Sequence, residues 1–230
     1  MSAAGQLAWA AADAYLFDID GTLLNVRDAT HLHAFHAAVQ SVFGVDSHID
    51  GVPIHGSTDV AILRAVLRRR GLRDCDFEPR LPQAVAAMCA EVRAKAAALR
   101  PEVCPAIPAL LERLRDRGKL LGVVSGNLET IGWLKIEAAG LRPWFAFGCF
   151  SGAVEQREDI FRQGIAEVRR RLGGAATVCV VGDTPSDVLA ARATGVSIIA
   201  VATGIFGVDQ LRPCQPDVCV SGCSELLGYL

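Results

Sequence analysis

Five short stretches of the chain are apolar almost throughout, without alternation between apolar and polar positions. They lie at 14–19, 120–126, 145–150, 177–183 and 197–203. Continuous apolar runs of this length are typical of strands buried on both faces of a parallel sheet, whereas alternation is typical of strands with one solvent-exposed face. The pattern therefore predicts a set of buried parallel strands.

Segments with helical spacing of apolar residues separate the later runs. They cover 105–118, 128–141, 157–174 and 186–195, and several end on a glycine, a common helix stop. A repeated order of strand and helix predicts an α/β fold with a doubly wound, Rossmann-like parallel sheet.

The interval between the first two strands breaks this alternation. It has little strand signal, and its apolar spacing predicts three helices at 28–44, 57–71 and 81–99. We therefore expect a core formed by residues 1–25 and 99–230, with a helical unit inserted at 26–98.

Composition excludes several classes of protein. The 230 residues are 51% hydrophobic, which supplies a sizeable core and argues against disorder. The formal charge of −2 gives no basic excess for nucleic-acid binding, and no apolar run reaches the roughly 18 residues of a membrane span. The first residues lack the early Lys or Arg of a secretory signal, so we expect a soluble cytoplasmic protein.

The eight cysteines do not form a recognisable ligand pattern. No C-x-x-C pair occurs, and Cys214, Cys219 and Cys223 have no histidine nearby to complete a zinc site. Buried free thiols are the expected state, with an oxidised C-terminal pair as the alternative.

Polar residues follow three of the predicted strands. Asp18 and Asp20 follow the first, 125–127 (Ser-Gly-Asn) follow the second, and Asp183 and Asp187 follow the fourth. The carboxyl ends of parallel strands meet at one edge of the sheet, where ligands bind in such folds. Like charges this close disfavour joint ionisation, so the pattern calls for a hard divalent cation with oxygen ligands, and Mg²⁺ fits best.

The order of "DIDGTLL", "SGNLE" and "GDTPSDVLAARATG" resembles the haloacid dehalogenase superfamily, over nearly the whole chain. Within it, the chain is similar to the branch of phosphoglycolate-phosphatase-like enzymes, and the helical insertion resembles a C1-type cap. The resemblance implies a phosphatase in which Asp18 attacks phosphorus and Asp20 protonates the leaving alcohol and then activates water. Residues i and i+2 of an extended segment point the same way, which suits this pair.

The resemblance also implies a metal site. The carboxylates of Asp18 and Asp183 and the backbone carbonyl of Asp20 would hold Mg²⁺. Asp187 would orient the metal's surroundings, although its place at a helix start also suits a cap.

Phosphate oxygens would be bound by the Ser125 hydroxyl and the backbone amides of Gly126 and Asn127. The superfamily usually has a lysine between its second and fourth motifs, and no lysine lies in this chain after Lys135. Arg157 is our candidate for this cation, because a guanidinium binds phosphate oxygens in pairs. The alternatives are Arg162 and the arginines at 169–171.

Two groups in the inserted helices invite a functional interpretation. "HGSTD" at 55–59 resembles a cap segment of this branch, so His55 or Thr58 is expected to meet the leaving group, unless Thr58 merely caps the next helix. His33 and His36 share a helix face, but His31 does not join them and no third ligand is evident. A solvated or half-buried helix face is therefore the expected role of these histidines.

The expected substrate is a small phosphorylated metabolite, with phosphoglycolate as one candidate. A sugar-phosphate phosphomutase and a catalytically silent phosphate binder are the alternatives. A dehalogenase is disfavoured because those relatives lack the second aspartate. Nothing in the sequence indicates the oligomeric state.

Overall fold

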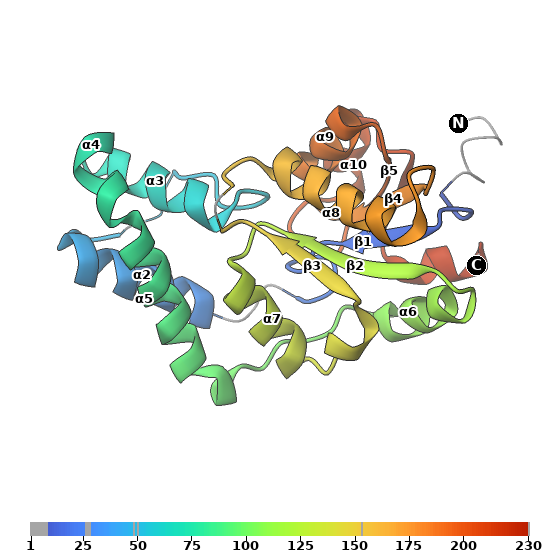
Figure 1. The fold of residues 1–230 in the computed structure, drawn as a ribbon, viewed down its shortest axis with the longest axis horizontal. Helices are drawn as coiled ribbons and strands as arrows, with labels where there is room; N and C mark the ends of the chain where they lie inside the picture. Colours follow the sequence, from blue (N-terminus) through green and yellow to red (C-terminus); the bar gives the residue numbers. More distant parts are fainter. Residues whose placement is uncertain (1–8, 26–28, 48, 50, 153, 230) are drawn as a thin grey trace.

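The computed structural model describes residues 9–25, 29–47, 49, 51–152 and 154–229. Its centre is a six-stranded sheet of order β3-β2-β1-β4-β5-β6, in which every neighbouring pair is parallel (Figure 1). The predicted doubly wound α/β fold is thus confirmed. The strands are β1 (Ala14–Phe17), β2 (Leu120–Ser125), β3 (Phe147–Phe150), β4 (Val178–Gly182), β5 (Ser197–Val201) and β6 (Val218–Val220).

Helices cover both faces of the sheet, which explains why its strands are continuously apolar (Figure 1). In β1, Tyr15 and Phe17 pack into the cluster on one face, and Ala14 and Leu16 into the cluster on the other. The first face is covered by α6 (Ile107–Asp116) and α7 (Glu129–Ala138), and the second by α8 (Arg157–Leu172), α9 (Pro185–Thr194) and α10 (Val208–Leu211).

The inserted segment is helical, as predicted, and forms a hydrophobic cluster of its own. It contains α2 (Thr30–Phe43), α3 (Asp59–Arg69), α4 (Asp74–Phe77) and α5 (Leu81–Ala94), with short 3₁₀ turns at 78–80 and 96–98. Leu128 and Ile131 of the α7 region join this cluster, so the insertion packs on the core at the carboxyl ends of the strands (Figure 1). The division at 26–98 stays a prediction, and residues 26–28, including the predicted helix start, lie outside the described residues.

The sequence pattern missed the C-terminal part of the sheet. Strand β6 has three residues and pairs with β5 alone, so its apolar run is too short to stand out. The preceding α10 has four residues, which is too short to show a helical period.

All eight cysteines are free, and Cys104, Cys179 and Cys223 are buried. Within the described residues, no helix combines the length and apolar character needed to cross a bilayer.

Candidate active site

The predicted site residues lie where the strand order changes direction. Chain order runs one way from β1 through β2 to β3 and the other way from β4 to β6, so a crevice forms beyond the ends of β1 and β4. Asp18 directly follows β1, and its amide donates to the carbonyl of Val181 in β4. Asp183 directly follows β4. The sheet therefore brings these two aspartates together although they are far apart in the chain.

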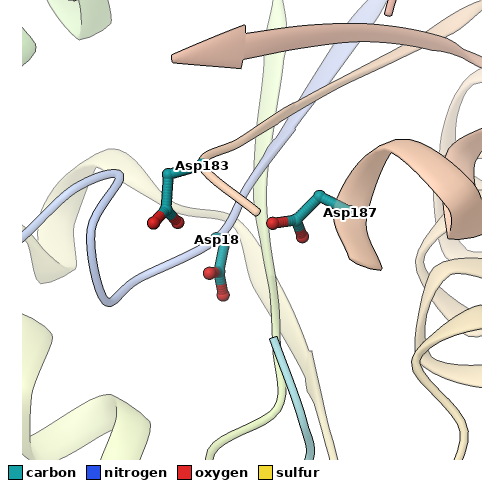
Figure 2. A group of neighbouring side chains, drawn as sticks. All are labelled: Asp18, Asp183 and Asp187. Atoms are coloured by element: carbon teal, nitrogen blue, oxygen red, sulfur yellow. The ribbon is translucent and has the colours of Figure 1, made fainter. Parts of the chain in front are cut away.

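Three carboxylates converge in this crevice. Asp18, Asp183 and Asp187 are all buried, and one carboxylate oxygen from each lies within 4.8 Å of the others. Figure 2 shows Asp18 and Asp183 reaching in from the strand ends and Asp187 from the first turn of α9, so that the three side chains gather in one place. Such a group of oxygen donors suits a hard divalent cation.

The electrostatics of this cluster also favour a cation. Burial raises the pKa of Asp18, and the charges of Asp187 and Asp20 raise it further against the opposing effect of Arg157. Burial and the charges of Asp18 and Asp187 likewise raise the pKa of Asp183. Asp18 and Asp183 therefore hold protons more readily than ordinary carboxylates do, and a divalent cation would displace these protons.

Arg157, the first residue of α8, is the cation that the structure places against this cluster. Its Nη2 lies 2.9 Å from Asp18 Oδ2 and 2.6 Å from Asp187 Oδ1, and its Nε donates to the same Asp187 oxygen at 2.7 Å. Nη2 is buried and forms no hydrogen bond of good geometry. Its N–H groups can therefore donate to an oxygen atom of a ligand. Arg157 also lines the cavity described below.

Three of the four alternative arginines have other partners, and the fourth, Arg169, is exposed. Arg162 pairs with Glu158 and Asp159 on an exposed helix face. Arg170 and Arg171 both pair with Glu167. Of the arginines we considered, Arg157 is the one that contacts the carboxylates.

Asp187 forms the helix cap that its position suggests, and it also contacts Arg157. Its Oδ2 accepts from the backbone amide and the hydroxyl of Thr184, which completes a capping box at the start of α9. Its Oδ1 accepts from Arg157. Because both oxygens are engaged, Asp187 acts by holding Arg157 in place and by adding charge to the cluster.

Asp183 lies in a cradle that has no room for additional side chains. A Cβ atom at Gly21 would lie 2.2 Å from Asp183 Oδ2, and one at Gly204 would lie 1.8 Å from the same oxygen. Thr22 donates its hydroxyl to the other oxygen, Oδ1, at 3.2 Å. Gly21 also has a φ of 86°, which glycine adopts without strain. The sequence analysis did not predict that Thr22 and Gly204 contact Asp183.

The segment after β2 lies opposite the aspartates and lines the same cavity. The Asn127 side chain donates to Ser125 Oγ at 2.9 Å and to Asp20 Oδ2 at 2.8 Å. Gly126 packs against the inserted segment, because a Cβ there would lie 2.5 Å from the carbonyl oxygen of Ser57. The structure thus brings 125–127 beside Asp20, as predicted.

Lys135 of α7 is a site residue that sequence reasoning missed. Its Nζ donates to both oxygens of Asp20, at 3.0 and 2.7 Å, and to Asn127 Oδ1 at 2.9 Å. Burial raises the pKa of Asp20, but the charge and hydrogen bonds of Lys135 and a hydrogen bond from Asn127 outweigh it, so the net shift is downward. A lone lysine inside the apolar stretch "IGWLKI" was the available signal.

The inserted helices reach the same site through His31 and Asp59. His31 Nδ1 lies 3.1 Å from Lys135 Nζ, and its Nε2 lies 3.1 Å from Asp59 Oδ2. Asp59 also accepts from the amide of Leu128 at 2.7 Å, while its own amide donates to the carbonyl of Gly126. These bonds connect α2 and α3 directly to the segment after β2.

Of the other residues predicted in the insertion, one lines the cavity and the rest lie elsewhere. His55 lines the cavity. Thr58 is absent from its lining; its hydroxyl accepts from the amide of Ala61, capping α3, and donates to the carbonyl of Glu155 at 2.8 Å. His33 is exposed, and His36 pairs with Ser47.

A cavity of about 360 Å³ lies between the strand ends and the inserted helices. The catalytic candidates line its floor, and residues of α2, α3 and the loop that joins them line its opposite wall. Its floor residues are Asp18, Asp20, Ser125, Gly126, Asn127, Lys135, Arg157 and Asp183.

Comparison with known proteins agrees with this arrangement. Residues 12–195 match the family model described as haloacid dehalogenase-like hydrolase. The chain belongs to this family. Curated relatives of this chain include proteins named as phosphatases.

The individual relatives have low sequence identity to this chain, but the similarity extends over nearly the whole length of both proteins. "Probable phosphatase IndB" of Dickeya dadantii is 28% identical over 221 residues, covering 93% of this chain and 91% of that protein. Phosphoglycolate phosphatase of Agrobacterium fabrum is 26% identical, covering 94% and 91%. A structure of CbbY from Rhodobacter sphaeroides with xylulose-1,5-bisphosphate has a TM-score of 0.71 at 19% identity, with 94% of this chain and 96% of that one covered.

The cradle around Asp183 gives a direct test of the cation site. The change Gly204→Ala forces the Asp183 carboxylate to move, so binding of a divalent cation should weaken by about 10–100-fold, as for other groups that orient metal ligands. Isothermal titration with Mg²⁺ measures this affinity. The matched control is Gly174→Ala, since a Cβ at Gly174 meets nothing within 4 Å. Equal affinities in the two variants would contradict the assignment.

Proposed function

We propose that the protein is a magnesium-dependent phosphatase that hydrolyses a small phosphomonoester through an aspartyl-phosphate intermediate. The observation that carries this proposal is the position of Asp18, directly after β1, between Asp183 and the guanidinium of Arg157. This position offers a nucleophile beside positive charge at the ligand-binding edge of the sheet.

In the first step, a carboxylate oxygen of Asp18 attacks phosphorus and the bond from phosphorus to the alcohol oxygen breaks. The negative charge of a bound phosphate favours the protonated form of Asp20. Asp20 then donates this proton to the alcohol oxygen, so the alcohol leaves uncharged. In the second step, the ionised Asp20 takes a proton from water, and the water oxygen attacks phosphorus to release inorganic phosphate and free Asp18. Lys135 stabilises the ionised form of Asp20, which is the form that the second step requires.

The remaining groups neutralise and position the phosphoryl group, which is the main requirement of phosphoryl transfer. Arg157 would donate to a phosphate oxygen through Nη2, which forms ion pairs with Asp18 and Asp187 but no hydrogen bond of good geometry. The Ser125 hydroxyl and the amides of Gly126 and Asn127 would bind the other oxygens.

The residues present fit a magnesium ion, as the glycine cradle and the raised pKa values of Asp18 and Asp183 indicate. The carboxylates of Asp18 and Asp183 and the backbone carbonyl of Asp20 would hold it. When bound, the ion supplies positive charge against the phosphate oxygens.

Phosphoglycolate is the first compound to assay, because curated relatives carry the name phosphoglycolate phosphatase. A phosphomutase would return the phosphoryl group to its substrate, whereas a silent binder would release none. A panel of phosphomonoesters with Mg²⁺, read by phosphate release and product analysis, separates these three activities.

Replacing the nucleophile is the sharpest test of the reaction. The change Asp18→Asn should lower kcat by about 10⁴-fold or more, because an amide oxygen is a poor nucleophile and no phosphoenzyme can form. Rapid acid quenching with a ³²P-labelled substrate should trap labelled wild-type protein and no labelled variant. The control Asp46→Asn changes an exposed aspartate of the inserted segment and should retain both signals. Labelling of the Asp18→Asn variant would place the nucleophile elsewhere.

Removing Lys135 should change the pH dependence of turnover. In Lys135→Met, the charge and the hydrogen bonds of Lys135, the largest influences that lower the pKa of Asp20, are lost, so this pKa rises. A base acts only when ionised, and therefore the acidic limb of kcat should move to higher pH, with a larger loss at pH 5 than at pH 8. Steady-state profiles at saturating Mg²⁺ measure the shift. Lys95→Met, on the surface of the insertion, serves as the control; coincident profiles would exclude this role of Lys135.

Magnesium binding should depend on pH in a defined direction. Because the pKa values of Asp18 and Asp183 are raised without a cation, protons compete with the metal below those values and the competition fades as pH rises. Affinity should therefore increase between pH 5.5 and 8, with protons released on binding. Calorimetry at pH 6.5 in two buffers of different ionisation enthalpy counts these protons. The Asp183→Asn variant should release fewer protons than the wild type when Mg²⁺ binds. A wild-type protein that releases no protons would contradict the raised pKa values of Asp18 and Asp183.

A further inference from the structure

The wall of the cavity opposite the catalytic floor differs sharply from the floor. Large aliphatic and aromatic side chains cover it, and they come from α2, α3, the α2–α3 loop and the segment after β5. They are Leu32, Phe35, Ile49, Ile54, Ile62 and Ile205. A leaving group bound to the phosphoryl group would meet this apolar wall.

The cations that line the cavity are already paired at the floor. Arg157 lies against Asp18 and Asp187, and Lys135 against Asp20. A transferred phosphate is the group that these two cations can share. Among the lining residues that the structure describes, they leave no further Lys or Arg for an anionic group farther from the floor.

The polar groups of the wall also disfavour a second anion. His31 has both ring nitrogens engaged, one by Lys135 and one by Asp59, and Asp59 itself adds negative charge. His55 is exposed, so solvent screens any charge that it carries. Arg64 of α3 does not line the cavity and is paired with Glu78 and Glu155. Among the described lining residues, none offers a free Lys or Arg at the wall.

The inference rests on the proposed phosphatase activity: we propose that the substrate carries one phosphoryl group on an uncharged leaving group with an apolar surface. A leaving group with a carboxylate or a second phosphate would lose its hydration against Ile54 and Ile62 without gaining an ion pair. The cavity volume of about 360 Å³, near the lower end for ligand pockets, limits the leaving group to a small one.

Matched substrate pairs test this specificity. Isobutyl phosphate and 2-phosphoglycolate have leaving groups of nearly the same shape, but that of phosphoglycolate is charged. Benzyl phosphate and 4-carboxybenzyl phosphate repeat the comparison with similar leaving-group basicity. In each pair kcat/KM should be at least about tenfold higher for the uncharged member, since hydrophobic pockets discriminate by about 10–200-fold per methylene. Equal values, or a preference for the charged members, would overturn the proposal.

A binding measurement separates this inference from the proposed reaction. Benzylphosphonate and 4-carboxybenzylphosphonate cannot be hydrolysed, and their affinities are read by calorimetry in the presence of Mg²⁺. Tighter binding of the uncharged phosphonate without any turnover of the phosphate esters would refute the phosphatase reaction but support the specificity. Equal binding, tighter binding of the carboxylate or binding of neither would refute the specificity.

A wall variant provides the converse test. Ile62→Lys places a cation on the α3 side of the cavity, so it should reduce or reverse the preference within each pair. Leu189→Lys adds the same charge at an exposed position of α9 and should leave the preference unchanged. An unchanged preference in Ile62→Lys would show that the wall does not contact the leaving group. If Ile62→Lys fails to fold, Ile54→Lys tests the same wall from the α2–α3 loop.

Discussion

The ends of β1 and β4 place carboxylates close together in a buried crevice, and the surrounding structure compensates this charge. Isolated buried carboxylates would take up protons instead of remaining ionised. Arg157 is paired with two of them, and Gly21 and Gly204 leave room for the Asp183 carboxylate. The charge of Arg157 reduces the repulsion within the cluster, which suits the proposed role of Asp18 as a nucleophile.

A second ionic centre surrounds Asp20, the proposed proton-transferring residue. Lys135 contacts Asp20, Asn127 and His31, and through His31 it is linked to Asp59 of the inserted helices. The inserted segment is therefore connected to the reaction centre by polar contacts as well as by apolar packing. The two described Lys and Arg residues of the lining are engaged at its floor, and the opposite wall carries mostly apolar side chains. This asymmetry is the basis of the proposed substrate class.

Much of the fold and site could be read from local patterns. Strands buried on both faces require continuous apolar runs, so β1, β2, β4 and β5 were evident, and the carboxylates after them were expected to converge. Strand β6 escaped because three residues carry too little periodicity. Thr58 showed the opposite difficulty: a hydroxyl before a helix suits both a cap and a ligand contact, and only its partners, Ala61 and Glu155, distinguish the two.

The sequence by itself determined the α/β class, the helical insertion and the acidic residues of the site, because neighbouring residues encode each of them. The tertiary structure decided which cation meets which carboxylate. Lys135 and Asp20 are 115 positions apart, and Arg157 and Asp187 are 30 apart. Such pairings depend on how α7, α8 and the strand ends pack together. The periodicity of apolar residues predicts each helix or strand separately, but it does not predict how they pack.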